Sequence, residues 1–153
     1  MVNSIDVAIY ILEKIDRATT MKLQKLVYYA QARHIVYSHA KLFDDKIEAW
    51  ANGPVMPALF HVHSGKYMVC RGDLDFAKSN GIFSDSEKSD IDAVIDRLGK
   101  CSGEQLRELS HNELPWKEAR RGYAAAERCS VEISPKSILH FYSSPDCKNP
   151  VVH

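Results

Sequence analysis

The sequence predicts a mainly α-helical fold: a compact single-domain bundle of six or seven helices around one central helix, with room for one short strand pair. Three observations predict it. Apolar residues recur at helical spacing in several separate segments, helix-capping residues precede most of these segments, and segment 21–39 has two apolar faces. At 153 residues the chain is long enough for one core to bury roughly two-thirds of its unfolded surface.

The balance of charges and the N-terminal pattern limit the possible functions. Twenty Lys and Arg residues match twenty Asp and Glu residues, so the chain lacks the broad positive potential of a general nucleic-acid binder. Charged residues interrupt the apolar pattern near the N-terminus, which excludes a secretory signal, and the uncharged stretch 26–32 is too short to span a bilayer. We therefore expect a cytoplasmic protein without membrane contact. Its four cysteines are then expected to be reduced thiols: Cys70, Cys101, Cys129 and Cys147.

The first two helices are expected to be antiparallel neighbours, because only residues 17–20 connect them. Asn3 or Ser4 can cap the first helix, and Thr19 or Thr20 can cap the second. The apolar face of the first helix comprises Ile5, Ala8, Ile9, Leu12 and Ile15.

The second helix, over 21–39, carries apolar residues on two nearly opposite sides when it is wound at about 100° per residue. One side holds Leu23, Leu26, Val27, Ala30, His34 and Tyr37, and the other holds Met21, Tyr28, Ala32, Ile35, Val36 and His39. Two polar stripes separate them, one of Lys22, Lys25 and Arg33 (with Tyr29) and one of Gln24, Gln31 and Ser38. Such a helix is expected to lie between two layers of other helices. The basic stripe predicts a solvated face, or alternatively a surface that meets an acidic partner.

The chain that follows the central helix is predicted to be mostly irregular. Ile47–Trp50 is extended, and Val131–Ile133 is the other segment that can form a short strand. Asn52-Gly53-Pro54 forms a turn, because glycine allows unusual dihedral angles and the following proline disfavours a helix. Pro57 suits the first turn of a short helix through His63, and 66–84 is expected to be a loop with short ordered pieces.

Four further helices are predicted in the second half of the chain. Capping boxes at Ser84 with Glu87 and at Ser102 with Gln105 begin the first two. Pro115 begins the third, which is expected to reach Ala126, and Ser134-Pro135 begins the last, over 136–143. The domain is therefore expected to span residues 1–144, and 145–153 to be a frayed C-terminal tail.

Local signatures of catalysis and of metal binding are missing from the sequence. It contains no GxSxG, HExxH, paired CxxC or glycine-rich phosphate loop, so no cofactor is expected and an enzyme is unsupported. His61 and His63, close to Cys70, form the tightest group of ligand types, but residues two apart on a helix point to different sides. The alternative that remains is a small metal-dependent or histidine-based hydrolase that uses His34, His61, His63 or His111.

Two local features exceed what packing alone requires. In Glu48-Ala49-Trp50-x-x-Gly53-Pro54-Val55 a tryptophan stands beside a rigid turn, either as a lid on the core or as an exposed aromatic anchor for a partner. In Leu109-Ser110-His111-x-x-x-Pro115-Trp116, His111 ends one helix, where a cation meets the dipole favourably, and Pro115 starts the next. This corner indicates either a buried hydrogen-bonding hinge at His111 or a direct binding role.

Three blocks of the chain, in order, resemble the Panacea domain family, the SocA-like antitoxins that are also described as phage-associated proteins. Leu23-Gln24-Lys25-Leu26-Val27-Tyr28-Tyr29-Ala30-Gln31 is similar to the family's LQKLLYFAQ helix. Leu42-Phe43 with Glu48–Val55 is similar to its PLF…EAWxxGPV block, and Leu109–Trp116 is similar to its LTHxExPW block. Lys41 stands where the family often has Pro, and Ser110 where Thr is usual.

The resemblance implies a non-enzymatic antitoxin that neutralises the toxin encoded beside it, usually by direct protein binding. In one branch of the family the antitoxin acts as a proteolytic adaptor that delivers the toxin to an ATP-dependent protease. The family-defining positions are Gln24, Lys25, Tyr28, Trp50, Gly53, Pro54, His111 and Trp116. Most of them are expected to shape the scaffold, and the surface that selects the toxin is expected in 66–84 or near the termini.

Overall fold

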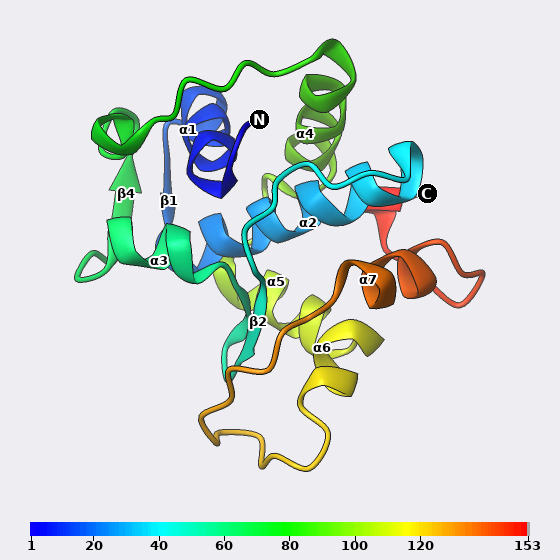
Figure 1. Ribbon diagram of the computed structural model, residues 1–153. Helices are drawn as coiled ribbons and strands as arrows, with labels where there is room; N and C mark the ends of the chain where they lie inside the picture. Colours follow the sequence, from blue (N-terminus) through cyan, green and yellow to red (C-terminus); the bar gives the residue numbers. More distant parts are fainter. Residues whose placement is uncertain (153) are drawn as a thin grey trace.

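The computed structural model describes residues 1–152, and it confirms the mainly α-helical fold around a central helix. Helix α2 (Thr20–Ser38) crosses the middle of the molecule (Figure 1). Helices α1 (Ser4–Ile15) and α4 (Asp85–Leu98) pack on one side of it, and α5 (Gly103–His111) and α7 (Pro135–Tyr142) on the other. The two apolar faces predicted for this helix are thus both used.

The predicted caps of the first two helices are present. The Asn3 side chain accepts from the Asp6 amide at 2.9 Å while the Asp6 carboxylate accepts from the Asn3 amide at 3.0 Å, a closed capping box. Thr19 Oγ1 accepts from the Lys22 amide at 3.2 Å and begins α2.

Two short antiparallel strand pairs accompany the helices, where the sequence indicated one. Strand β2 (Glu48–Trp50) pairs with β3 (Gly53–Val55), and residues 131–133 lie along its other edge, where the Ile133 amide donates to the Ile47 carbonyl at 2.7 Å. The second pair, β1 (Arg17–Thr19) with β4 (Met68–Cys70), was not predicted. Each of its strands has three residues, too few for an alternating pattern to be visible.

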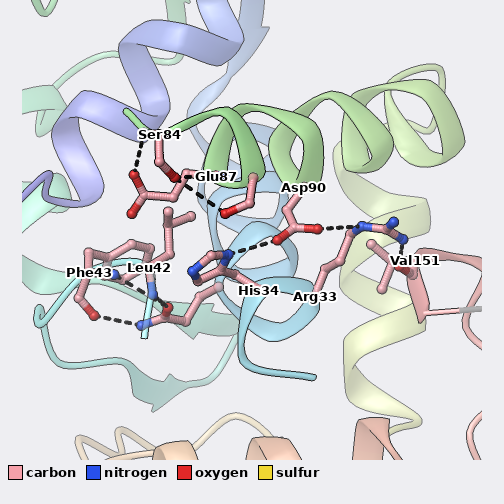
Figure 2. A network of polar contacts seen from close by, with 10 residues as sticks. Arg33, His34, Leu42, Phe43, Ser84, Glu87, Asp90 and Val151 are labelled. Atoms are coloured by element: carbon pink, nitrogen blue, oxygen red, sulfur yellow. Dashed lines mark hydrogen bonds and ion pairs between the residues drawn. The ribbon is translucent and has the colours of Figure 1, made fainter. Parts of the chain in front are cut away.

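The basic stripe of α2 is not the solvated face that the sequence predicted. Lys25 is 1% exposed, and Arg33 forms an ion pair with Asp90 of α4 at 3.1 Å (Figure 2). On the second stripe, the buried Gln31 amide accepts from the Leu42 amide at 2.6 Å and donates to the Phe43 carbonyl at 2.7 Å. The buried amide thus supplies hydrogen bonds to a buried loop backbone, which would otherwise lack them.

The remaining helices begin where the sequence predicted. Helix α3 spans Pro57–His63, and capping boxes at Ser84 and Ser102 begin α4 and α5. Helix α6 (Leu114–Ala119) is shorter than expected, because the chain turns at Gly122, whose φ is +91°, instead of continuing to Ala126. The Arg120 guanidinium holds this turn by donating to the carbonyls of Ala124 at 2.7 Å and Glu127 at 2.6 Å.

The C-terminal segment is ordered against the domain instead of frayed, as far as residue 152. Its 3₁₀ turn η2 (Pro150–Val152) packs on α4, and Val151 and Val152 are buried. Arg33 donates to the Val151 carbonyl at 2.7 Å (Figure 2), so the guanidinium that pairs with Asp90 also fixes this segment. Residue 153 lies outside the described residues.

The segment 66–84 is a loop with short ordered pieces, as predicted: strand β4 and the 3₁₀ turn η1 (Asp75–Ala77). No helix among residues 1–152 combines the length and the apolar character that a membrane crossing requires.

Candidate functional site

Five of the eight residues that the family resemblance singles out meet at one place, where the β2–β3 turn packs against α2, α5 and α6. Lys25 comes from α2, His111 from the end of α5 and Trp116 from α6. Trp50 ends β2 and Gly53 begins β3, on either side of the turn. Residues that are far apart in the sequence blocks are therefore neighbours in the fold.

Gly53 is the point of closest approach between the turn and the central helix. Its φ is +116°, a conformation that L side chains rarely adopt. A Cβ atom built here would lie 2.4 Å from Cε of Lys25 and 3.1 Å from Oγ of Ser110. Only glycine fits here, because the backbone has a positive φ and the buried Lys25 side chain leaves no room for a Cβ atom. The adjacent Pro54 is buried in β3, opposite Ala49.

Replacing Gly53 with alanine is expected to lower the free energy of unfolding by about 2–4 kcal/mol, the sum of dihedral strain and overpacking against Lys25. Gly65→Ala is the matched control, because Gly65 also has a positive φ (+88°) but no atom within 4 Å of its Cβ position. Urea denaturation followed by circular dichroism measures both. Equal losses in the two variants would contradict the predicted contact, and adding Lys25→Ala should restore part of the Gly53→Ala loss.

The corner between α5 and α6 is a stacked pair. The rings of His111 and Trp116 lie 3.8 Å apart at 10°, and the Trp116 indole N–H donates to the Trp50 carbonyl at 2.8 Å. Burial, together with the charges of Arg107, Lys25 and Arg120, lowers the pKa of His111 to about 4. The imidazole is therefore neutral at pH 7, and the favourable cation–dipole interaction predicted at this helix end is absent. Its Nε2 is buried without a hydrogen-bond partner among residues 1–152.

A pocket of ≈ 560 Å³ opens beside this cluster. Its walls include the following side chains: Gln24, Lys25, Trp50, Phe60, His63 and Cys129. Trp50 is half-buried, packs edge-on against Phe60 with ring centroids 5.0 Å apart, and donates to Glu48 at 2.9 Å. It is thus a wall of the pocket, intermediate between a lid on the core and a fully exposed anchor.

Gln24 and His63 form one side of the pocket. The Gln24 amide is oriented by the Met56 backbone, since it accepts from the Met56 amide at 2.9 Å and donates to the Met56 carbonyl at 3.3 Å. Its N–H₂ group also lies 3.0 Å from Nε2 of His63, which must then accept. Burial is the main reason why the pKa of His63 is lowered, so this imidazole is neutral as well.

Lys25 is the unusual group of the pocket, because its ammonium has no charged partner. Burial, and secondarily the charge of Arg107, lowers the pKa of Lys25 to about 7. No carboxylate among residues 1–152 lies within ion-pair distance of it. A buried lysine without a counter-ion is expensive, so either the fold tolerates the cost or a ligand offsets it.

Tyr28 belongs to a different buried cluster, centred on Glu113. The Tyr28 hydroxyl lies 2.9 Å from that of Tyr142, which donates to Glu113 at 2.7 Å. Tyr29 and Asn149 also donate to this carboxylate, at 2.7 and 2.9 Å. Sequence reasoning did not single out Glu113. Two signals were available: Glu113 is the Glu of the LTHxExPW block, and the adjacent tyrosine pair lies in a buried helix, where tyrosine hydroxyls need partners.

The histidines of the hydrolase alternative do not converge. His34, on α2, pairs with Asp90 at 2.7 Å (Figure 2). His63 contacts Gln24, which precedes His34 by ten residues on α2 and therefore lies about 15 Å from it along the helix axis. His61 is exposed. His111 is stacked on Trp116. Across the described residues, no group of three or more His, Cys, Asp or Glu side chains is placed to hold a metal ion.

Comparison with known proteins assigns the family. Residues 23–117 match the family described as "Antitoxin SocA-like, Panacea domain". The protein named "Antitoxin SocA" of Caulobacter vibrioides (strain NA1000 / CB15N) is 32% identical over 130 residues, which cover 78% of this chain and 69% of that protein. No solved structure matches the chain. The matched range contains all three sequence blocks and the five residues that meet at the β2–β3 turn: Lys25, Trp50, Gly53, His111 and Trp116. The chain therefore belongs to the SocA-like antitoxin family with the Panacea domain.

Proposed function

We propose that this chain is a cytoplasmic antitoxin that neutralises the toxin encoded beside it by binding the toxin directly. The observation that carries the proposal is the 32% identity to a protein named Antitoxin SocA, over most of both chains. The scattered histidines support a binding protein over a hydrolase, since no two of them share a substrate-sized pocket with a nucleophile and an orienting acid.

The segment 66–84 supplies the surface that we propose for toxin contact. Four large hydrophobic side chains along it are exposed: Tyr67, Met68, Phe76 and Ile82. Phe76 and Ile82 are 76% and 88% exposed, and neither is needed to fill the core. Exposed apolar patches mark interaction sites, and aromatic residues and methionine are enriched at the cores of protein interfaces.

Phe76→Ser and Ile82→Ser, alone and together, are expected to weaken toxin binding by about tenfold or more without loss of folding stability, because each removes an interface anchor. Tyr123→Ser is the matched control, an exposed hydrophobic side chain (41%) on the α6–α7 connection. Co-expression with the toxin measures growth rescue, and pull-down of the toxin measures the complex.

Three outcomes are decisive for this proposal. Growth arrest by the toxin, no rescue by the wild type and no complex would refute direct neutralisation. Unchanged rescue by the Phe76→Ser/Ile82→Ser variant would refute only the proposed surface. Sequestration is distinguished from delivery to an ATP-dependent protease by the toxin level, which stays constant in the first case and falls in a protease-dependent manner in the second.

A further inference from the structure

We propose that the pocket beside Lys25 binds an organic anion, a carboxylate carried on an apolar body of one or two rings. The first observation is the unpartnered lysine itself. Lys25 is 1% exposed, lines the pocket, and has no ion pair among residues 1–152. A buried cation at the wall of an open pocket attracts a negative ligand group, and the interaction is strong because few solvent molecules screen it.

The other polar groups of the pocket favour an anion over a cation. Glu48 is the one acidic side chain in the lining, and its carboxylate already accepts from the Trp50 indole at 2.9 Å. The positive charge of Arg107, on α5, lies close enough to lower the pKa of Lys25, and Arg128 lines the pocket. The local charge is therefore positive.

The remaining walls favour an apolar body that carries a single negative charge. Trp50 and Phe60 form an aromatic wall, with Met21 and Val55 beside it. The volume of ≈ 560 Å³ lies within the range of small-molecule pockets, about 300–1,000 Å³. One buried ammonium balances a single negative charge, such as a carboxylate carries, whereas a phosphate monoester carries about −1.5 to −2 at pH 7.

Binding and protonation are coupled at this site. A carboxylate binds the charged form of Lys25, so above the pKa of about 7 the affinity should fall about tenfold per pH unit. The groups that face Lys25 do not compete in this range. His63 from α3 and His111 from α5 have lowered pKa values and are already neutral, and Arg107 remains charged.

The test uses the full chain with two probes, 2-naphthoate and its neutral analogue 2-naphthalenemethanol, titrated by NMR. Lys25→Met removes the charge and keeps the apolar stem, and Lys66→Met is the control at an exposed lysine. We expect saturable naphthoate binding that Lys25→Met weakens about 10- to 100-fold and Lys66→Met leaves unchanged. The neutral analogue should bind the wild type and Lys25→Met equally.

The pH dependence of naphthoate binding by the wild type, from pH 7 to 9, tests the same inference without a variant. No saturable naphthoate binding, equal binding by Lys25→Met, or affinity that does not change with pH would each overturn it. Addition of the toxin identifies the source of the natural carboxylate. Displacement of the probe indicates a carboxylate of the toxin, and a ternary complex indicates a free organic acid. Growth rescue is measured separately, so failure of this inference leaves the proposed antitoxin function intact.

Discussion

Replacing Glu113 with alanine is expected to lower the free energy of unfolding by about 3–5 kcal/mol, because the change leaves three buried donors without an acceptor. The hydroxyls of Tyr29 and Tyr142 and the amide of Asn149 all donate to this one carboxylate, at 2.7, 2.7 and 2.9 Å. These donors come from α2, α7 and the C-terminal segment. The loss is therefore expected to loosen three parts of the fold at once, and urea denaturation followed by circular dichroism measures it.

Two variants separate the buried acceptor from a general effect of removing an acid. Glu118→Ala, in helix α6, whose N-cap residue is Glu113, removes an exposed carboxylate paired with Arg121 and is expected to cost at most about 0.5 kcal/mol. Glu113→Gln keeps one acceptor oxygen for the two tyrosine hydroxyls, but its amide N–H₂ group would face the Asn149 N–H₂ group, donor against donor. We therefore expect an intermediate loss of unfolding free energy. Equal losses for Glu113→Ala and Glu118→Ala would contradict the central role of Glu113.

The pH dependence of the Glu113 site has a defined sign. Burial raises the pKa of Glu113 in the folded protein, against the lowering effect of its hydrogen bonds. The folded chain then binds a proton more tightly than the unfolded chain. The wild type should therefore lose stability relative to Glu113→Gln as the pH rises from the ordinary carboxyl value through the raised pKa.

The parts of the fold that are determined locally were predictable from the sequence. The caps at Thr19, Ser84 and Ser102 and the start of α3 at Pro57 each depend on neighbours within about four residues, and all are present. The pairing of β1 with β4 depends on a contact between residues 17–19 and 68–70, and no local pattern encodes it.

The burial of polar residues on α2 was not predictable for a related reason. Helical spacing shows which residues share a face, but not what that face meets. Gln24 and Gln31 are buried because loop backbones need their amides, and the loops come from later in the chain. The tail was misjudged similarly, since Arg33 provides the donor that holds Val151.

The candidate site was predictable as a set of residues through the family resemblance, but not as an arrangement. The blocks contain Lys25, Gly53 and Trp116, yet their spacing does not show that the Gly53 turn lies against the Lys25 side chain. Nor does it show that Tyr28, in the same block as Lys25, belongs to the separate Glu113 cluster. Glu113 is itself the Glu of the LTHxExPW block, two positions after His111, but its role could not be inferred, because its partners come from distant segments.

Replacing Lys25 with methionine is expected to raise the free energy of unfolding at pH 7 by about 2–4 kcal/mol, because the folded wild type holds this amine away from water. The pKa of Lys25 is lowered from 10.5 to about 7 by burial and by Arg107. Between these two values the unfolded chain binds the extra proton and the folded chain does not. Wild-type stability relative to Lys25→Met should therefore rise with pH, by about 2 kcal/mol from pH 7 to pH 9.

Urea denaturation of both proteins at pH 7, 8 and 9 measures this difference, and comparison with the variant removes the contribution of groups that titrate in both. The range stops at pH 9 because the buried hydroxyls of Tyr28, Tyr29 and Tyr142 have raised pKa values, so both proteins lose stability once free tyrosines ionise. Lys66→Met, at an exposed lysine, is the control for the loss of one positive charge. A flat difference for Lys25→Met would mean that the folded chain binds the Lys25 proton as tightly as the unfolded chain does, which would contradict the uncompensated burial on which the proposed anion site rests.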